Sequence, residues 1–268
     1  WTHLVYTYAG GTGGAMKLYV NGVEKATNTG TANIPTSSLS GTYIGSIADN
    51  TSFNFNGKIS QAGVWNEELT ADEVSSLYNH GLPIDLTTDQ AAYESSSNLV
   101  GYWRMGSGTL DSYPLIADQT NATLGSELIT NGDFANGTTG WTVTGSGTAS
   151  IVDNALNYSN TVNGSWFAQF ISQAVSFVQN KIYKVTFKAK NISGSVNLRI
   201  THQSHIIFNN NLTSSFVDYT VYYTAQANND SIRIFCNDAI GEFQIDNVSI
   251  KQVNGNPAIM TNQTSSDI

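Results

Sequence analysis

Residues 183–190, Tyr-Lys-Val-Thr-Phe-Lys-Ala-Lys, alternate apolar and polar side chains without a break. Successive side chains of a β-strand point to opposite faces of the sheet, so this stretch has one apolar face and one face of lysine and threonine. Similar alternation occurs in residues 197–201 and 218–223. The pattern predicts strands of antiparallel sheets that are each buried on one side.

Short runs of this kind, separated by Gly, Asn, Ser and Thr, recur along the chain. In the first part they fall at residues 4–8, 17–20, 42–47 and 58–65. Asn21-Gly22 supplies the two positive-φ residues of a tight hairpin turn. Many short strands joined by turns predict a β-sandwich or barrel, so the fold class is all-β.

One short helix is predicted after Thr70. In Thr70-Ala71-Asp72-Glu73 the Thr70 hydroxyl and the Glu73 carboxylate satisfy each other's backbone donors, which is a capping box. An apolar stripe and a stop signal follow, in Val74, Leu77, Tyr78, Gly81 and Pro83. We therefore expect Glu73 to cap the helix rather than to act as a catalytic acid.

At 268 residues the chain is long enough for two domains of roughly 100–200 residues each. It carries 11 Lys and Arg against 20 Asp and Glu, a formal net charge of −9. A surface of that sign repels phosphate, so we expect no nucleic-acid partner. No run approaches the roughly 18 apolar residues of a membrane-spanning helix, and we expect no membrane insertion.

The sequence offers little support for catalysis. Glycosidases of the concanavalin-A type use closely spaced carboxylates along one strand, and no such run occurs in this sequence. Glu67 and Glu68 are adjacent in a loop, where consecutive side chains diverge. Phosphate-loop, dinucleotide and Gly-x-Ser-x-Gly motifs are also absent. We therefore predict that the chain is not an enzyme.

The last strand-like run changes phase. Phe243 and Ile245 fall at odd positions, whereas Val248 and Ile250 fall at even ones. Because the side-chain period of a strand is two, both pairs face the core only if an extra residue is inserted near Asp246-Asn247. We predict a β-bulge there. Bulges re-aim side chains, so Asp246 is a candidate ligand.

Several motifs of the first part occur in a characteristic order: Trp1-Thr2-His3-Leu4-Val5-Tyr6, Leu18-Tyr19-Val20-Asn21-Gly22, Tyr43-Ile44-Gly45, Phe55-Asn56-Gly57-Lys58-Ile59 and Val64-Trp65. Together they resemble the C-terminal half of a laminin-G-like, concanavalin-A-like jelly roll. Further strands precede these motifs in that family, so the resemblance implies an incomplete first sandwich over residues 1–98, with its N-terminal portion outside this sequence.

The segment after residue 98 carries one strand, at residues 99–104. This strand fits the closing strand of the first domain, and it is also similar to an opening strand of the same family. We assign residues 99–126 as a connecting strand and linker.

Three segments of the second part also belong together: Glu127–Phe134 with Gly140-Trp141, Tyr183–Phe187, and Phe243–Ile250. They resemble the family 4/9 type of carbohydrate-binding module, a galactose-binding-like jelly roll. The resemblance implies a second sandwich over residues 127–253, followed by a tail over residues 254–268. The expected fold is therefore two antiparallel β-sandwiches of the jelly-roll type, the first incomplete, with one short helix.

In that module family a structural calcium ion joins the opening segment to the closing strand. Carried over, the resemblance implies side-chain ligands from Asp133 and Asp246 and a backbone oxygen near Asn154. Calcium prefers about six to eight hard oxygen ligands, and the predicted bulge at Asp246 supports the site independently. The alternative is that both aspartates only cap turns by accepting backbone N–H bonds.

Sugar recognition needs a flat aromatic face and planar polar groups. The candidates are Trp166 with Gln169, then Arg199, Gln203 and Tyr222. By resemblance, Arg199 and Gln203 belong to a strand that lines the binding groove of the module family. The alternative is that Trp166 and Phe170 are core residues and Arg199 a solvated strand residue.

The two domain types are joined by Gly101-Tyr102-Trp103-Arg104-Met105 and followed by Asn256-Pro257-Ala258-Ile259-Met260-Thr261-Asn262. This arrangement is similar to virion-associated and tail-fibre-like proteins of marine phages. We expect a non-catalytic carbohydrate-binding or adhesion segment of a larger extracellular or virion protein. Its partners would be a polysaccharide or cell-surface glycan and other virion proteins. Two alternatives stay open: a structural virion module without sugar binding, and an accessory region of a polysaccharide-degrading enzyme.

Overall fold

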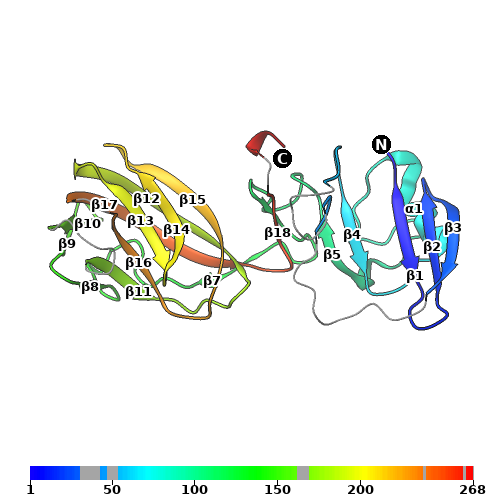
Figure 1. The fold of residues 1–268 in the computed structure, drawn as a ribbon, viewed down its shortest axis with the longest axis horizontal. Helices are drawn as coiled ribbons and strands as arrows, with labels where there is room; N and C mark the ends of the chain where they lie inside the picture. Colours follow the sequence, from blue (N-terminus) through cyan, green and yellow to red (C-terminus); the bar gives the residue numbers. More distant parts are fainter. Residues whose placement is uncertain (31–42, 47–53, 162–168, 238–239, 262–263, 268) are drawn as a thin grey trace. The chain divides into compact units, whose positions relative to one another are not determined.

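The computed structural model describes residues 1–30, 43–46, 54–161, 169–237, 240–261 and 264–267. It consists mostly of antiparallel β-strands, with one α-helix among these residues (Figure 1). The predicted all-β class is confirmed. The chain forms two compact units, which we call unit 1 (Trp1–Ala122 with Gly255–Ile268) and unit 2 (Thr123–Asn254).

Unit 1 is built from short strands around one helix. A three-stranded sheet contains, in this order, β1 (Leu4–Tyr8), β2 (Ala15–Val20) and β3 (Val23–Thr29). Two further pairs are β4 (Ala62–Trp65) with β5 (Leu99–Trp103), and β6 (Leu115–Ile116) with β18 (Ala258–Ile259). The 3-10 turns are η1 (Asn79–Gly81), η2 (Ser96–Asn98) and η3 (Ser265–Asp267).

The predicted hairpin and the predicted helix cap are both confirmed. Asn21 and Gly22 have φ values of 51° and 75° and connect β2 to β3. Helix α1 (Ala71–Tyr78) begins with the capping box: Thr70 Oγ1 accepts from the Glu73 amide at 3.2 Å, and Glu73 Oε2 accepts from the Thr70 amide at 2.9 Å. The helix ends before Gly81 because Asn79 already adopts the left-handed conformation of a C-cap.

Other segments of unit 1 differ from expectation. Residues 43–46 form a bend, and the rest of the strand expected at 42–47 lies outside the described residues. The strand expected from Lys58 begins only at Ala62. Most of the expected linker 99–126 and tail 254–268 packs within unit 1, as β5, β6 and β18. A two-residue strand such as β18 is too short to leave an alternating pattern in the sequence.

Unit 2 is a sandwich of two antiparallel sheets. The six-stranded sheet contains β15 (Val217–Thr224), β12 (Ile182–Gly194), β17 (Gly241–Val253), β10 (Ala155–Asn160) and β9 (Thr148–Val152), with β7 (Leu124–Glu127) beside β17. The five-stranded sheet contains β14 (His205–Asn211), β13 (Asn197–His202), β16 (Ser231–Cys236), β11 (Phe170–Ala174) and β8 (Thr142–Thr144). As the alternation predicts, the core takes Tyr183, Val185, Phe187 and Ala189 from β12.

The predicted β-bulge is present in β17. Two of its residues, Asn247 and Val248, lie opposite Phe187 of β12. Asn247 has a φ of 54°, in the left-handed region. The extra residue restores the phase of the strand, so that the core includes Phe243, Ile245, Val248 and Ile250.

Candidate functional site

The outer side of the five-stranded sheet carries a concentration of polar side chains. Leu198 and Ile200 of β13, and Ile232 and Ile234 of β16, point into the core. The residues between them therefore point outward. We call this surface the arginine face and define it by Asn197, Arg199, Thr201, Phe170, Arg233 and Asn237.

The strand register places these side chains next to one another. Thr201 of β13 is paired with Arg233 of β16, and the Asn237 amide donates to the Asn197 carbonyl at 2.8 Å. The Arg233 guanidinium lies 5.2 Å from the centre of the Phe170 ring, within the range of a cation–π contact. The central part of the arginine face thus combines a half-buried aromatic ring with a cation.

The edge of the arginine face is held by side-chain hydrogen bonds to β14. Arg199 Nε donates to Asn209 Oδ1 at 3.3 Å, and Asn197 Nδ2 donates to Asn211 Oδ1 at 3.0 Å. These contacts fix the guanidinium and the amide against the sheet. Both groups keep further donors or acceptors for a ligand.

Four buried polar atoms of this face have no hydrogen-bond partner in the part of the chain that the structure describes. They are Arg233 Nε, Thr201 Oγ1, Asn197 Oδ1 and Asn237 Oδ1. Leaving a buried polar atom unpaired costs about 1–3 kcal/mol, so several such atoms on one face require an explanation. All four lie beneath the surface, so the groups of this face that a ligand can reach belong to its partly exposed residues, Phe170, Arg199 and Arg233.

Of the sugar-binding candidates predicted from the sequence, Arg199 lies on the arginine face. Gln203 lies in the turn that follows β13, with a φ of 53°. Trp166 lies outside the described residues. Gln169 is buried, and its Oε1 accepts from the Thr161 amide at 3.1 Å, so it ties together the residues on either side of 162–168.

Tyr222 is not part of the same surface as Arg199. It lies in β15 of the six-stranded sheet, paired with Lys184 and pointing away from the core. The outer faces of the two sheets are opposite sides of the sandwich, so the structure does not bring Tyr222 to the arginine face. Sequence reasoning also missed Arg233 and Asn237, although the alternation of β16 around Ile232 and Ile234 carries the signal for both.

Two of the three predicted calcium ligands, Asp246 and Asp133, each have one carboxylate oxygen in contact with another group. Asp246 is buried, and its Oδ2 lies 3.0 Å from the Lys188 ammonium, while its Oδ1 has no partner among the described residues. Asp133 Oδ1 accepts from the Ala135 amide at 3.3 Å, as expected of a turn cap. Asn154 lies in the turn between β9 and β10. The described residues contain no group of three or more His, Cys, Asp or Glu arranged to hold a metal ion.

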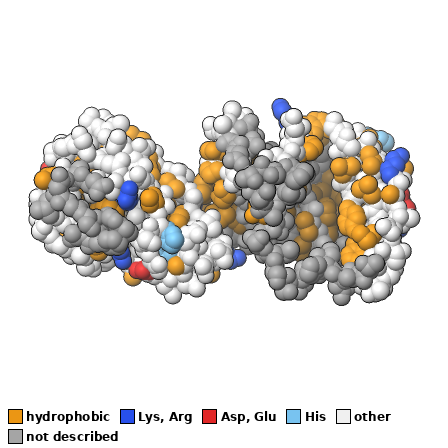
Figure 2. Space-filling view, viewed as in Figure 1, with side chains coloured by type: hydrophobic (Ala, Val, Ile, Leu, Met, Phe, Trp, Pro, Cys, Tyr) orange, Lys and Arg blue, Asp and Glu red, His pale blue; other side chains and the backbone are white. Residues whose placement is uncertain are grey.

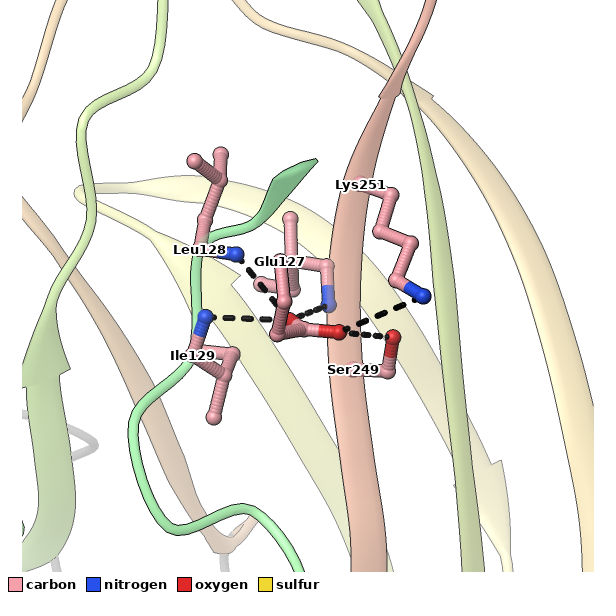
Figure 3. Close-up of polar contacts among 6 residues, drawn as sticks. Glu127, Leu128, Ile129, Ser249 and Lys251 are labelled. Carbon is pink, nitrogen blue, oxygen red and sulfur yellow. Dashed lines mark hydrogen bonds and ion pairs between the residues drawn. The ribbon is translucent and has the colours of Figure 1, made fainter. Parts of the chain in front are cut away.

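A carboxylate that the sequence did not single out joins the opening segment to the closing strand. Glu127 Oε1 accepts from the amides of Leu128, Ile129 and Ile250, at 3.1, 3.0 and 2.8 Å (Figure 3). Its Oε2 accepts from Ser249 Oγ at 2.5 Å and lies 4.0 Å from Lys251 Nζ. Glu127 therefore joins the same two parts of unit 2, the opening segment and the closing strand, that the family resemblance implies a calcium ion would join.

Unit 2 is thus a two-sheet antiparallel β-sandwich with a polar outer face beside an aromatic ring. Residues 126–237 match the family model of a carbohydrate binding domain, CBM_4_9. Residues 1–75 match that of the concanavalin A-like lectin/glucanases superfamily, Laminin_G_3. The two family resemblances found in the sequence are confirmed over these residues. A search of curated proteins finds no match.

Several solved structures are similar to part of the chain. One CBM4 structure is 19% identical, covers 46% of this chain and 99% of its own, and has a TM-score of 0.39. The CBM22-1 xylan-binding domain of Paenibacillus barcinonensis Xyn10C is 17% identical, with coverages of 49% and 97% and a TM-score of 0.40. The C-terminal family 22 module of Clostridium thermocellum Xyn10B is 16% identical, with coverages of 50% and 96% and a TM-score of 0.38.

In the part of the chain that the structure describes, α1 is the longest helix, and no helix has the length and apolar character needed to cross a membrane.

Proposed function

We propose that unit 2 binds carbohydrate, without catalysis, through the arginine face. The observation that carries the proposal is the half-buried Phe170 ring with the Arg233 guanidinium 5.2 Å from its centre, beside the partly exposed Arg199 guanidinium, which Asn209 holds against the sheet. The match of residues 126–237 to a carbohydrate binding domain supports it.

A neutral polysaccharide fits the chemistry of this face. Each sugar hydroxyl both donates and accepts hydrogen bonds, so a single chain can accept from the terminal guanidinium N–H groups of Arg199 and Arg233. The C–H surface of a sugar ring can pack on the exposed part of Phe170. Guanidinium and amide groups held by β14 lose little freedom on binding, which favours affinity.

The proposal also covers where the protein acts and how many copies are displayed together. A single sheet face of this kind binds weakly, and several copies displayed together would supply avidity. We propose an extracellular adhesive role, on a cell or a virion, with polysaccharide or cell-surface glycan as the ligand.

A second role, protein packing, is favoured by the three-stranded sheet of unit 1. Leu4 and Tyr6 of β1 are 65% and 56% exposed, and the residue paired with Tyr6, Leu18 of β2, is 39% exposed. Figure 2 shows apolar side chains at the surface of this unit. Apolar patches of this kind typically mark contacts with other proteins, as a virion module would make.

The sugar-binding proposal is tested with the full chain on an array of neutral glycans that includes xylan and β-glucan fragments. Arg233→Gln removes the guanidinium, and we expect it to weaken binding about tenfold or more, because a hydrogen bond from a charged donor contributes about 1.5–3 kcal/mol. Lys181→Gln makes the same charge change at an exposed position off the arginine face and should bind like the wild type. No binding to any glycan, or equal losses in both variants, would refute the proposal.

We also propose that a structural calcium ion binds beside the bulge, with Asp246 Oδ1 as a ligand. This oxygen is buried without a donor among the described residues, and the Gly132 carbonyl accepts from the Val248 amide at 2.9 Å, so the segment of Asp133 runs beside the bulge. Millimolar calcium should raise the Tm of the wild type but not that of Asp246→Asn. An unchanged wild-type Tm on adding calcium or a chelator would show that Lys188 alone neutralises Asp246.

A further inference from the structure

The outer side of the six-stranded sheet presents lysines at unusual density for a chain of net charge −9. Four of the 11 Lys and Arg residues of the chain point outward from its two central strands: Lys184, Lys188 and Lys190 from β12, and Lys251 from β17. Two of them have an acidic partner, Asp246 for Lys188 and Glu127 for Lys251. In the described part of the chain, no carboxylate lies within 4.0 Å of Lys184 or Lys190.

Lys184 and Lys251 are directly opposite each other in the strand register. Like charges at such positions repel, which destabilises a sheet unless a counter-charge lies between them. Glu127 supplies part of that charge from the Lys251 side, at 4.0 Å, but its carboxylate is already held by three backbone amides and Ser249 (Figure 3). One positive charge of the pair therefore stays uncompensated.

A surface cavity of about 150 Å³ lies at this lysine pair. It is lined by Leu124, Lys184, Thr186, Ser249 and Lys251. Thr186 of β12 and Ser249 of β17 are paired in the strand register, so their side chains lie side by side in the lining of the cavity. The Ser249 hydroxyl donates to Glu127, whereas no hydrogen bond of the Thr186 hydroxyl is found among the described residues.

The geometry points to a second binding site, in which this cavity takes the oxyanion of an acidic polysaccharide, a carboxylate or a sulfate group. The oxyanion would accept charge-assisted hydrogen bonds from Lys184 Nζ and Lys251 Nζ and a third from Thr186 Oγ1. Leu124 would contact the sugar ring that carries the group. The site is separate from the arginine face; the choice of a polysaccharide rather than another polyanion rests on the proposed function.

A polysaccharide suits the charge of the whole chain better than a nucleic acid. A nucleic acid bears a phosphate at every nucleotide, and unit 2, with 7 Lys and Arg against 8 Asp and Glu, has no excess of positive charge to attract it. A polysaccharide with isolated acidic groups needs only a local cation pair, which is what the cavity offers.

The experiment measures retardation of the full chain in native gels that contain polygalacturonate, dextran sulfate or neutral dextran. We expect retardation by polygalacturonate, dextran sulfate or both, and the comparison identifies the group that is preferred. Neutral dextran should give no retardation that depends on Lys184. Lys184→Gln should weaken the acidic interaction about tenfold, and Thr186→Val, which keeps every charge, about threefold.

Two control variants separate a built site from a general attraction of charges. Lys190 lies on the same face as Lys184, six residues along β12 and therefore about 20 Å from it. Lys190→Gln should change binding less than twofold. Lys181→Gln should behave in the same way. Equal losses in the Lys184, Lys190 and Lys181 variants, a Thr186→Val variant that binds like the wild type, or stronger binding to single-stranded DNA than to both acidic polysaccharides would overturn the inference.

The test of this cavity and the test of the arginine face give different results, because each uses its own variant and its own class of polysaccharide. Arg233→Gln should lose neutral glycans and keep the acidic polysaccharide, and Lys184→Gln should show the reverse. If Arg233→Gln abolished both, the acidic group would bind at the arginine face and the cavity would have no role.

Discussion

At the scale of single residues, Glu127 holds the first segment of unit 2 against its last strand. The carboxylate accepts three backbone amides and the Ser249 hydroxyl, from two stretches of chain more than 100 positions apart. Each such hydrogen bond contributes about 0.5–1.5 kcal/mol to the stability of the fold, and more when the acceptor is charged. A surface salt bridge such as that with Lys251, at 4.0 Å, contributes less.

We therefore predict that Glu127→Ala lowers the free energy of unfolding of unit 2 by about 2–3 kcal/mol. Glu127→Gln, which keeps one acceptor oxygen, should lie between this variant and the wild type. Urea denaturation followed by tryptophan fluorescence measures the difference. Asp153→Asn, at an exposed turn, is the matched control. A Glu127→Ala variant as stable as that control would show that the hydrogen bonds of Glu127 do not stabilise unit 2.

Glu73 gives a pH-dependent prediction for α1. Burial alone would raise the pKa of Glu73, but hydrogen bonds from the Ser95 hydroxyl, from Thr70 and from the Glu94 amide lower it below the ordinary value of 4.5. A carboxyl group whose pKa is lower in the folded state stabilises the fold above the unfolded pKa, and this contribution is lost as the pH falls through the folded pKa.

Glu73→Gln retains the shape of the capping box but removes the charge. Near pH 7 it should destabilise unit 1 by about 1 kcal/mol. The difference from the wild type should shrink as the pH falls below about 4.5. Unfolding curves at several pH values between 7 and 3 measure this; a difference that does not change with pH would contradict the assigned pKa direction.

At the scale of elements, the bulge in β17 keeps both halves of that strand in the core. Asn247 is the residue in the left-handed conformation, which asparagine and glycine tolerate and β-branched residues do not. Asn247→Val should destabilise unit 2 by about 1–2 kcal/mol, whereas Asn247→Gly should change its stability by less than half of that. Thermal unfolding of the two variants checks the prediction; a valine variant as stable as the glycine variant would mean that the bulge relaxes.

The elements that could be predicted from sequence are those with a local physical signature. The Asn21-Gly22 turn, the Thr70–Glu73 box and the phase change before Val248 each follow from a rule that acts over a few residues. The tie between Glu127 and Ile250, like the strand β18, depends on contacts between distant parts of the chain and leaves no local pattern. For the same reason Arg199 could be placed on an outward face, but its separation from Tyr222 required knowledge of which strands share a sheet.

At the scale of the whole molecule, the two units differ in formal net charge and in the surfaces they expose: unit 1 has 4 Lys and Arg against 12 Asp and Glu, and unit 2 has 7 against 8. The sandwich of unit 2 has two outer faces with distinct chemistry: unpaired polar atoms around Phe170 on one, and a lysine-lined cavity on the other. Unit 1 instead exposes apolar strand residues such as Leu4 and Tyr6. This division is consistent with the two proposed roles, glycan binding by unit 2 and protein contact by unit 1.

The most direct test of the account follows the side-chain Nε–H signals of the arginines in the ¹⁵N-labelled full chain during titration with a neutral oligosaccharide chosen on the array. The account predicts that the Arg233 and Arg199 signals shift progressively and together, and that the signal of Arg104 of unit 1 does not move. Saturating oligosaccharide that leaves the Arg233 signal unchanged would contradict the assignment of the arginine face as the sugar-binding surface.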